Sequence, residues 1–367
     1  MRSRRRSTLL EILAAAIFVV TTCALATPAN ASSAVAVANG GGAAADTGFS
    51  PGVTFGAAED AAAASAPGTL RLMAAGDTML ARTVGSRMVN DPSLPFARVT
   101  RMFARADVVV LNLECTISTG GIPEHKSFTF RAPPIAAQVL GNAHVDVVSQ
   151  ANNHGLDYGQ TALADSLSYL AAQGVKVAGA GQDAAQARAP VIIDQNGLRV
   201  AILAYLGYFH DAAGWSAYTW EAGPDAPGLV LARKAQIRAD VKDAKLLADV
   251  VVVFFHAGDD LATTPSNFQL AITDAALRAG ASLVLSASPH VLQGTRRGDH
   301  TFVAYSMGNF VFDQSHNMGN DSVIVDVTLS KAGVDAVRLI PVILVNAFPR
   351  PAYGADAARI MRELAPV

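Results

Sequence analysis

Short and almost continuous apolar runs recur along the chain from residue 70 onwards, and each one ends in a group of polar residues. Five such runs stand before polar groups, at 70–75, 108–113, 145–149, 250–255 and 282–285. Runs without polar alternation are typical of strands that are covered on both faces. Amphipathic stretches predict three helices, at about 160–173, 231–248 and 266–279. This alternation of strands and helices favours an α/β fold.

Two parts of the chain depart from this alternation. Asn196-Gly197 joins two β-rich runs within 190–204, and this dipeptide is typical of tight hairpins. Further strand-like runs, with little helix between them, follow at 301–306, 322–329 and 334–345. We therefore expect a mixed architecture in which a second, partly antiparallel sheet packs on the first. One domain from about 69 to 350 would hold both sheets, and a helical tail would follow at 351–367.

The first 68 residues have a different composition from the rest of the chain. Arginines at the start, an apolar stretch at 12–20 and the small residues Ala29-Asn30-Ala31 predict a signal peptide over 1–31 and hence export to the cell surface or beyond. A retained membrane anchor is the less favoured alternative, because the apolar stretch is shorter than the ~20 residues that a spanning helix needs. Residues 32–68 are rich in Ala, Gly and Ser, which predicts a disordered linker or an extension without a spacer role.

Charge and cysteine content restrict the classes of function. Without residues 1–31, which carry four arginines and one glutamate, the formal charge falls from −2 to −5. A mildly acidic protein is a poor candidate for binding nucleic acid. Cys115 is the single cysteine after residue 31, so no intramolecular disulfide can stabilise that part of the chain.

The polar groups after the five runs carry the candidate chemistry. They are Gly76-Asp77, Asn112-Leu113-Glu114, Asn152-Asn153-His154, the stretch 256–260 and the stretch 286–290. Because the carboxyl ends of parallel strands meet at one crevice, we expect these groups to lie together. Carboxylates, imidazoles and amide oxygens are ligands for Mn²⁺, Fe, Zn²⁺ or Mg²⁺. Two such ions about 3.5–4 Å apart can clamp a phosphoryl or acyl centre and lower the pKa of a bound water.

Each of these residues also has a purely structural interpretation. Asp77 could cap a helix, and Glu114 could pair with Lys126 or Arg131. Asn152 and Asn153 could close a turn through their own side chains. His256 and His290 could be hydrogen-bonded structural histidines. The metal-site hypothesis is favoured because all five groups stand at the ends of predicted strands.

The same residues, taken in order, resemble the motif series of a known family. The motifs are 76–80 (GDTML), 112–114 (NLE), 151–154 (ANNH) with 157–159 (DYG), His256 followed by Gly258, 288–293 (SPHVLQ) and 305–310 (YSMGNF). This series is similar to that of the poly-gamma-glutamate capsule biosynthesis proteins, the CapA family, over about 70–313. The resemblance implies the fold of the calcineurin-like metallophosphoesterases, a four-layer α/β/β/α sandwich with two packed mixed sheets and a metal site at the strand ends.

The resemblance also implies roles for particular residues. The residues at metal-ligand positions are Asp77, Glu114, Asn153 and His256. We add His290, from the fifth polar group, as a further candidate ligand. His154 falls at the position of a general acid. Candidate substrate-binding residues are Lys126, Arg131, Asn152, Asp260 and Asn309, of which the two cations would hold an anion by charge-assisted hydrogen bonds.

Two departures from the CapA family pattern, and one difference from ordinary phosphatases that the family shares, bear on the predicted site. Ser286-Ala287-Ser288 stands where the family has Gly-His-His, so the resemblance implies one ion rather than two. Ala257 and Asp260 replace a tryptophan and a glutamate, which implies a more open pocket in which Asp260 could still orient His256. Met79 stands where ordinary phosphatases of this superfamily have a histidine, which favours a specialised enzyme over a general phosphomonoesterase.

Two hypotheses of different classes follow. The first is an exported metal-dependent hydrolase or transferase acting on a phosphate ester or on an amide-linked polyanion such as poly-gamma-glutamate. The second is a non-catalytic accessory protein that binds or guides an anionic polymer beside membrane-bound capsule synthesis proteins. The five polar groups favour the first hypothesis, and the altered segment 286–288 favours the second.

Overall fold

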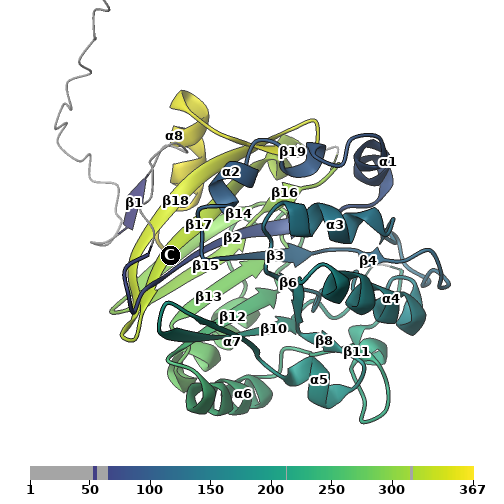
Figure 1. The fold of residues 1–367 in the computed structure, drawn as a ribbon, viewed down its shortest axis with the longest axis horizontal. Coiled ribbons are helices and arrows are strands. Elements are labelled where there is room, and N and C mark those ends of the chain that lie inside the picture. The colour runs from purple at the N-terminus through teal and green to yellow at the C-terminus, as the bar shows by residue number, and fades with distance from the viewer. Residues whose placement is uncertain (1–52, 56–64, 212, 315–316) are drawn as a thin grey trace, which may run out of the picture. The chain divides into compact units, whose positions relative to one another are not determined.

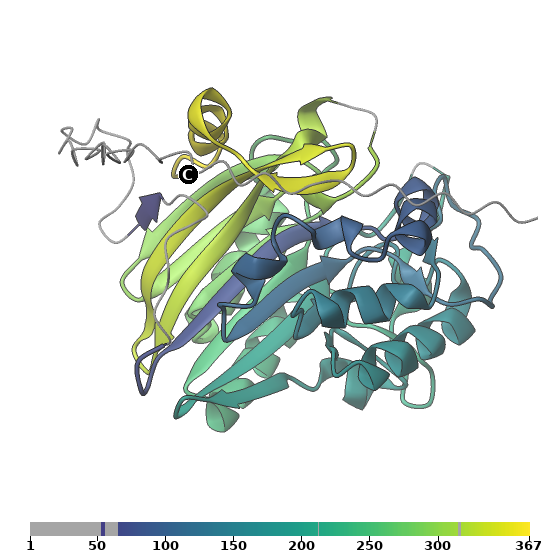
Figure 2. The ribbon, with the colours of Figure 1, turned by 45° about the horizontal axis from the view of Figure 1, so that its top comes forward.

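The computed structural model describes residues 53–55, 65–211, 213–314 and 317–367. The predicted signal peptide, 1–31, and most of the predicted linker, 32–68, lie outside these residues and stay predictions. The described part of the chain belongs to one unit, Asp46–Val367. Its strands form two large sheets, seen from several sides in Figures 1 and 2.

The larger sheet has nine strands and is mixed. Its core strands β2, β3, β6 and β7 are parallel, β17 pairs antiparallel with β2, and β18 pairs antiparallel with β17. The strand order is β1 (Val53–Phe55), β18 (Gly333–Val345), β17 (Asp321–Ser330), β2 (Leu70–Thr78), β3 (Val108–Leu113), β6 (Val147–Ser149) and β7 (Lys176–Ala178), with β16 (Asn309–Val311) on β2 and β19 (Phe348–Pro351) on β18.

The smaller sheet has six strands and is also mixed. Its order is β14 (Leu292–Gly298), β15 (Thr301–Met307), β13 (Leu283–Ala287), β12 (Val250–His256), β10 (Leu198–Leu206) and β9 (Val191–Gln195). The hairpin between β9 and β10 is confirmed, and Asn196 and Gly197 take φ values of 55° and 77°. Both values lie in the left-handed region that a two-residue hairpin of this type requires.

Short pairs of strands complete the described structure. These are β4 (Thr116–Ile117) with β5 (Arg131–Ala132), and β8 (Ala180–Gly181) with β11 (Gly228–Leu229). Single 3₁₀ turns lie at η1 (Leu94–Phe96), η2 (Ala217–Trp220) and η3 (Asn317–Asn320). These elements connect the larger sheets and add loops near the strand ends.

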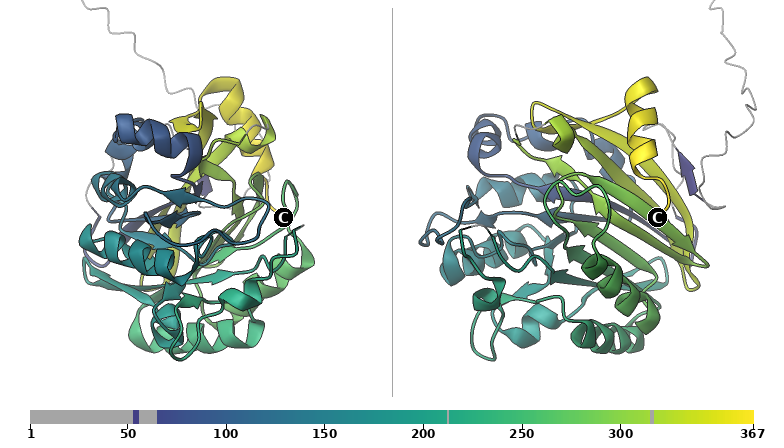
Figure 3. Two further views of the ribbon diagram at one scale, coloured as in Figure 1. Left: turned by 90° about the vertical axis from the view of Figure 1, so that its right-hand side faces the viewer. Right: turned by 180° about the vertical axis from the view of Figure 1, so that it is seen from behind.

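Helices cover the outer face of each sheet. α1 (Arg82–Asn90), α2 (Thr100–Phe103), α3 (Ile135–Asn142) and α4 (Gly159–Ala172) pack on the nine-stranded sheet, and α6 (Lys234–Leu247) and α7 (Asn267–Ala279) on the six-stranded sheet. α5 (Ala184–Arg188) and α8 (Gly354–Glu363) are the remaining helices of the described residues. Two further views show the paired sheets with helices outside them (Figure 3).

Alternation along each strand divides the apolar side chains among three cores. In β2, Leu72 lies in the core between the sheets, whereas Met73 lies under the outer helices. In β12, Val252 faces the core between the sheets and Val253 faces α6 and α7. This is the period-two pattern of a strand covered on both faces. Three cores separate four layers, which confirms the predicted α/β/β/α sandwich.

The division of strands between the sheets differs from the expectation. The antiparallel runs at 322–329 and 334–345 belong to the first sheet, as β17 and β18. The apolar runs at 250–255 and 282–285 form β12 and β13 of the second sheet, where they are parallel to each other. The five polar groups therefore come from two stacked sheets and not from one open sheet.

Both ends of the predicted domain are extended by ordered elements. β1 pairs with β18 in parallel, with Val53 opposite Val337, so these three residues of the predicted linker form a strand. The predicted C-terminal tail contains α8, and Ile360 and Leu364 are fully buried in the core between the sheets. Among the residues described, no helix is both long and apolar enough to cross a membrane.

Candidate metal centre

The polar groups at the strand ends lie together, although they come from both sheets. Asp77 lies in β2 of the larger sheet, whereas His256 ends β12 and His290 follows β13 of the smaller one. Asp77 Oδ1 is 3.7 Å from His256 Nδ1, and Asp77 Oδ2 is 3.3 Å from His290 Nδ1. Asn153 Oδ1 lies 2.9 Å from His256 Nε2. The carboxyl ends of the parallel strands in the two sheets thus meet at one place.

Three of these side chains form a compact group of the kind that holds a metal ion. One ligand atom from each of Asp77, Glu114 and His290 lies within 4.8 Å of the others. His290 Nε2 is 3.9 Å from Glu114 Oε1. Two carboxylates and an imidazole suit a divalent ion such as Mn²⁺, Zn²⁺ or Fe²⁺.

Glu114 is the residue whose surroundings indicate a cation most directly. The side chain is fully buried, and neither carboxylate oxygen has a hydrogen-bond partner among the described residues. Burial, together with the negative charge of Asp77, raises the pKa of Glu114 well above its ordinary value. A buried carboxyl group without hydrogen bonds is costly unless a cation or proton compensates it. The donor set and this unpartnered carboxyl group fit a divalent ion.

His290 has the orientation of a metal ligand. Asn309 uses its amide NH₂ to donate to Gln314 and to the carbonyl of Gly319, so its Oδ1 faces His290 Nδ1 at 2.9 Å and accepts a hydrogen bond. The other nitrogen, Nε2, is directed towards Glu114. Although burial disfavours the charged ring, the carboxylates of Glu114 and Asp77 raise the pKa of His290 to about 10.

Asn309 thus has a different place from the one that the resemblance implies. The sequence predicts that it binds substrate, but its side chain is fully buried and holds His290. Such a hydrogen bond to the far nitrogen of a ligating histidine fixes the ring and its tautomer. Asn309 is therefore a positioning residue.

His256 and Asn153 are hydrogen-bonded to each other in this structure. Asn112 donates through Nδ2 to Asp77 Oδ1 at 2.8 Å and approaches His256 Nδ1 at 3.1 Å, so Nδ1 is the acceptor. His256 Nε2 then carries the hydrogen and donates it to Asn153 Oδ1. Burial lowers the pKa of His256 to about 3, which agrees with a neutral ring. Their predicted roles as metal ligands stay predictions, and would require this bond to open.

His154 lies beside the same group and is held by an acid three residues later. Its Nδ1 atom is 2.5 Å from Asp157 Oδ2, and its Nε2 atom is 3.8 Å from Glu114 Oε1. Asp157 also accepts hydrogen bonds from Lys126 and from the backbone N–H of Phe130, so Nδ1 of His154 is the donor. Burial lowers the pKa of His154 to about 4. The resting ring is neutral, with its Nε2 lone pair available to a proton.

The two cations that were predicted to bind an anion do not present free charges to the site. The Lys126 side chain is only 2% exposed and forms an ion pair with Asp157 at 2.7 Å. It also donates to the carbonyl of Asn153 and lies over the rings of Trp215 and Trp220. Its charge therefore fixes the loop that carries His154.

Arg131 lies outside the cavity described below. It is exposed, donates to the carbonyl of Gly120 at 2.8 Å and stacks on Tyr158. The described geometry does not place it in the lining of this cavity, and its role in binding substrate stays a prediction.

Asn152 is likewise structural. Its side chain is fully buried, donates to Asn112 Oδ1 at 3.1 Å and to the carbonyl of Leu113 at 2.8 Å, and accepts from the backbone N–H of His154. The polar atoms of the Asn152 side chain all form hydrogen bonds within the protein. In this structure the Asn152 side chain joins the loop after β6 to β3, and its role in binding substrate stays a prediction.

A cavity of about 430 Å³ opens above the metal-ligand group. His154, His290 and Asn153 form part of its lining, and Asp260 lies at its exposed rim, as a substrate-binding prediction requires. Burial raises the pKa of Asp260, and the charge of Asp77 adds to this shift. Residues that the motifs did not single out also line the cavity: Arg82, Phe130, Tyr208, Phe312 and Asp313.

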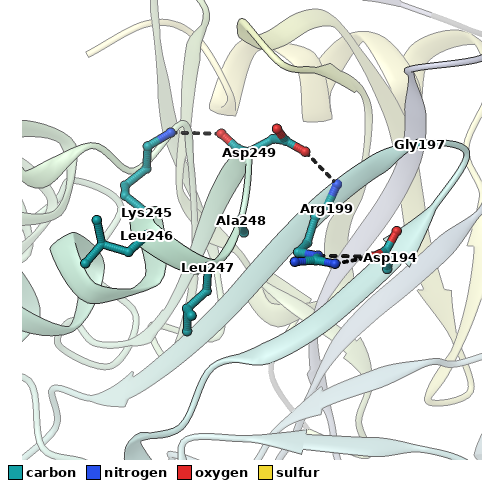
Figure 4. A pocket seen from close by; sticks show the side chains of 8 residues that line it. All are labelled: Asp194, Gly197, Arg199, Lys245, Leu246, Leu247, Ala248 and Asp249. Atoms are coloured by element: carbon teal, nitrogen blue, oxygen red, sulfur yellow. Dashed lines mark hydrogen bonds and ion pairs between the residues drawn. The ribbon is translucent and has the colours of Figure 1, made fainter.

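A second hollow lies apart from this chemistry. Figure 4 shows it between the β9–β10 hairpin and the end of α6, where Lys245, Asp249 and Arg199 form hydrogen bonds across its wall. Its lining holds no residue of the metal-ligand group. The metal-ligand group borders the first cavity through His290.

The altered segment 286–288 contributes backbone and not ligands. The Ser288 N–H group donates to Asp77 Oδ2 at 3.2 Å, and the Ser288 hydroxyl group donates to the carbonyl of Gly258. Ser286 is buried within β13. The hydroxyl groups here offer no imidazole nitrogen to an ion, and the number of ions stays a prediction.

The family model that matches the chain is that of the bacterial capsule synthesis protein PGA_cap, over residues 71–314. The chain belongs to this family. Among PGA_cap relatives, the PGA biosynthesis protein CapA of Bacillus subtilis (strain 168) is 30% identical over 274 residues, covering 73% of this chain and 70% of the relative. The capsule biosynthesis protein CapA of Bacillus anthracis is 29% identical, covering 80% of this chain and 72% of the relative.

Other similarities of this PGA_cap member are more distant. A probable polyglutamine synthesis accessory protein of Mycobacterium tuberculosis (strain ATCC 25618 / H37Rv), Rv0574c, is 28% identical and covers 59% of this chain and 58% of the relative. Among solved structures, a hypothetical protein from Thermus thermophilus has a TM-score of 0.47 at 15% identity, covering 77% of this chain and 100% of that one. A structure described as a putative 5'-nucleotidase from Staphylococcus aureus has a TM-score of 0.45 at 15% identity, covering 80% and 58%. Likeness of this degree carries no argument about function.

Two site residues were missed by sequence reasoning although signals for them existed. Asp157 lies three residues after His154, a spacing that lets a loop acid reach the ring, and the structure uses it so. Asn112 begins one of the polar groups and touches both Asp77 and His256. Both stand in the quoted motifs without a role assigned to them.

Proposed function

We propose that this protein is an exported, metal-dependent hydrolase or transferase in the synthesis of a surface polyanion, with an amide-linked glutamate polymer or a phosphate ester as substrate. Membership of the PGA_cap family and the printed names of the two Bacillus relatives support a place in capsule or poly-gamma-glutamate synthesis. The observation that carries the catalytic part is the buried, unpartnered Glu114 carboxyl group between Asp77 and His290.

The residues that would hold the ion are Asp77, Glu114 and His290, with His256 and Asn153 beside them. A bound divalent ion would polarise a carbonyl or phosphoryl oxygen and make a water molecule more acidic. Asn309 and Ser288 hold His290 and Asp77 in place for this purpose.

His154 is the residue that would move a proton. Its neutral Nε2 atom faces the metal-ligand group, while Asp157 keeps the hydrogen on Nδ1. Nε2 can therefore accept a proton from the attacking group and give it to the leaving amine or alcohol. The stacked ring of Phe130, 4.0 Å from the imidazole centroid, restricts rotation of His154.

Export through residues 1–31 and association with membrane-bound polymer synthesis proteins belong to the same proposal. The Arg-rich start, the apolar stretch and the small residues before Ser32 support export. N-terminal sequencing of the protein from its native culture medium or cell surface tests this step. A chain that begins at Ser32 is expected, and one that retains residues 1–31 contradicts cleavage.

A non-catalytic, polymer-binding accessory protein is the second candidate. It is supported by Ser286-Ala287-Ser288, which supplies no imidazole, and by the word "accessory" in the name of the Mycobacterium relative. In that case the cavity would bind a polymer segment without cleaving it.

Turnover measurements separate the two candidates. The Mn²⁺- or Zn²⁺-reconstituted protein is incubated with poly-gamma-glutamate and with p-nitrophenyl phosphate, and polymer length and nitrophenol release are followed. For an enzyme, His154→Gln should lower the rate by about 10²–10⁴ with unchanged metal content. Polymer binding that is the same in wild type and His154→Gln, with no turnover in either metal, contradicts catalysis and supports the accessory role.

A further inference from the structure

Arg82 is a cation on the cavity wall that the motifs did not identify. Lys126, the other cation in the lining, is nearly fully buried in its ion pair with Asp157. The Arg82 side chain is 35% exposed, and it pairs through one guanidinium nitrogen with Asp313. Of these two cations, Arg82 is therefore the one that is accessible to an anionic ligand in the cavity.

Two aromatic rings hold this guanidinium in place. Arg82 Cζ lies 4.6 Å from the ring centroid of Phe130 and 5.7 Å from that of Phe312. The two rings contact each other edge to face, with centroids 5.9 Å apart. A guanidinium stacked on aromatic faces keeps its donor edges available for hydrogen bonds in the ring plane.

The same rings contact the two imidazoles of the site. Phe130 stacks on His154 with centroids 4.0 Å apart, and Phe312 packs on His290 with centroids 5.0 Å apart. The Phe130 ring thus contacts both Arg82 and His154, the candidate proton carrier. The Phe312 ring contacts both Arg82 and His290, a candidate metal ligand. A ligand group held by Arg82 lies next to the atoms that would react.

The backbone at Arg82 is strained. Arg82 is the first residue of α1 and has a φ of 48°, in the left-handed region that favours glycine. Strained residues of this kind cluster at ligand-binding sites, where the surrounding structure holds them. Here Asp313 accepts a hydrogen bond from the backbone N–H of Thr83 at 3.0 Å as well as from the side chain of Arg82. Asp313 therefore fixes the start of the helix and the direction of the guanidinium.

We propose that Arg82 is the specificity-determining residue of this cavity and that it binds the carboxylate next to the amide bond of a γ-linked glutamate chain. In such a chain the carbon attached to each amide nitrogen also carries a carboxylate, so the anion and the reacting bond are neighbours. Arg82 can bind a carboxylate through two parallel hydrogen bonds. This inference rests on the proposed function and names the substrate class for that site.

Asp313 forms an ion pair with the Arg82 guanidinium when no ligand is bound. A ligand carboxylate must compete with it for Arg82, so Asp313 restricts binding to groups that can replace an internal carboxylate. Neutral amides cannot do so, because they offer no charge to Arg82. The pair therefore favours anionic over neutral chain segments.

Binding of two matched oligomers tests this inference. The metal-loaded wild-type protein is titrated calorimetrically with a γ-linked glutamate oligomer and with the same oligomer in which every α-carboxylate is a carboxamide. Wild type should bind the anionic oligomer at least about tenfold more tightly. Arg82→Gln should lower this preference below about threefold, and Arg82→Lys should retain only part of it.

Two further variants distinguish recognition from a purely structural ion pair. Asp313→Asn should tighten binding of the anionic oligomer, because the competing charge is removed while the bond to Thr83 can persist. Arg278→Gln, at an exposed arginine of α7 outside the cavity, should bind as wild type does. Circular dichroism checks that each variant is folded.

The outcomes separate this inference from the proposed function. If wild type binds the anionic oligomer and Arg82→Gln binds it equally well, the inference is wrong and the proposed function stands. If wild type binds neither oligomer, the proposed substrate class and the inference both fail. Weaker binding in Asp313→Asn would also contradict the competition that we infer.

Discussion

At the scale of single residues, ion pairing in the protein interior distinguishes side chains with a structural role from candidate metal ligands and proton carriers. Lys126 and Asp157 neutralise each other, whereas the carboxyl group of Glu114 has no hydrogen-bond partner among the described side chains. Sequence alone identified Asp77, Glu114 and His290, because each stands at a strand end. It did not predict the contacts of Asn152 and Arg131, because short polar motifs do not show whether an amide or a guanidinium turns into the protein or away from it.

The buried Lys126–Asp157 pair gives a prediction about stability. Asp157→Asn leaves the Lys126 charge uncompensated and should cost about 3–5 kcal/mol in the free energy of unfolding. Combining it with Lys126→Met removes that charge, so the double variant should lose less than Asp157→Asn alone. Chemical denaturation of wild type, Asp157→Asn, Lys126→Met and the double variant measures the coupling energy between the two side chains.

The exposed Arg199–Asp194 pair is a suitable control. Both of its side chains are more than half exposed, and water screens their interaction. Its coupling energy should be about 0.2–1 kcal/mol. Equal coupling energies for the two pairs would contradict the structural role that we assign to Lys126.

At the scale of elements, strand contacts at the end of β2 place the first candidate ligand. Asp77 donates its backbone N–H to the carbonyl of Gly308 at 3.0 Å, and Asn309 of β16 lies opposite Asp77. The sequence predicted β2, the β9–β10 hairpin and α7 from local patterns. It did not predict β16, because this strand has only three residues. So short a segment shows no periodic pattern of apolar and polar positions.

Gly76 is required by this close approach. A Cβ atom at residue 76 would lie 1.8 Å from the carbonyl oxygen of Gly308, which is backbone and cannot move aside alone. Gly76→Ala should therefore destabilise the protein by about 1–3 kcal/mol and weaken metal binding through displacement of Asp77. Thermal unfolding and metal titration measure the two effects.

Gly120→Ala provides the comparison, because a Cβ atom there would meet atoms no closer than 3.8 Å. Its effect on stability should stay within about 0.5 kcal/mol. A Gly76→Ala variant as stable as Gly120→Ala would show that β2 and β16 do not approach as closely as described.

At the scale of the whole molecule, the site depends on two sheets stacked face to face. Three of the polar groups belong to the nine-stranded sheet and two to the six-stranded sheet, and the core between the sheets fixes their separation. The four-layer order followed from the family resemblance, while local patterns gave strands, helices and the expectation of two packed sheets. Parallel strands with similar apolar runs do not show which sheet they join, so the division between sheets required the structure.

The central claim is that Asp77, Glu114 and His290 hold a divalent ion, and metal binding by the folded protein tests it most directly. Elemental analysis and calorimetric titration of purified protein, before and after reconstitution with Mn²⁺ or Zn²⁺, should give about one tightly bound ion per chain. Glu114→Gln should stay folded and bind the ion at least about 100-fold more weakly. A folded wild-type protein that takes up no ion under either condition, or a Glu114→Gln variant with unchanged affinity, would contradict the account.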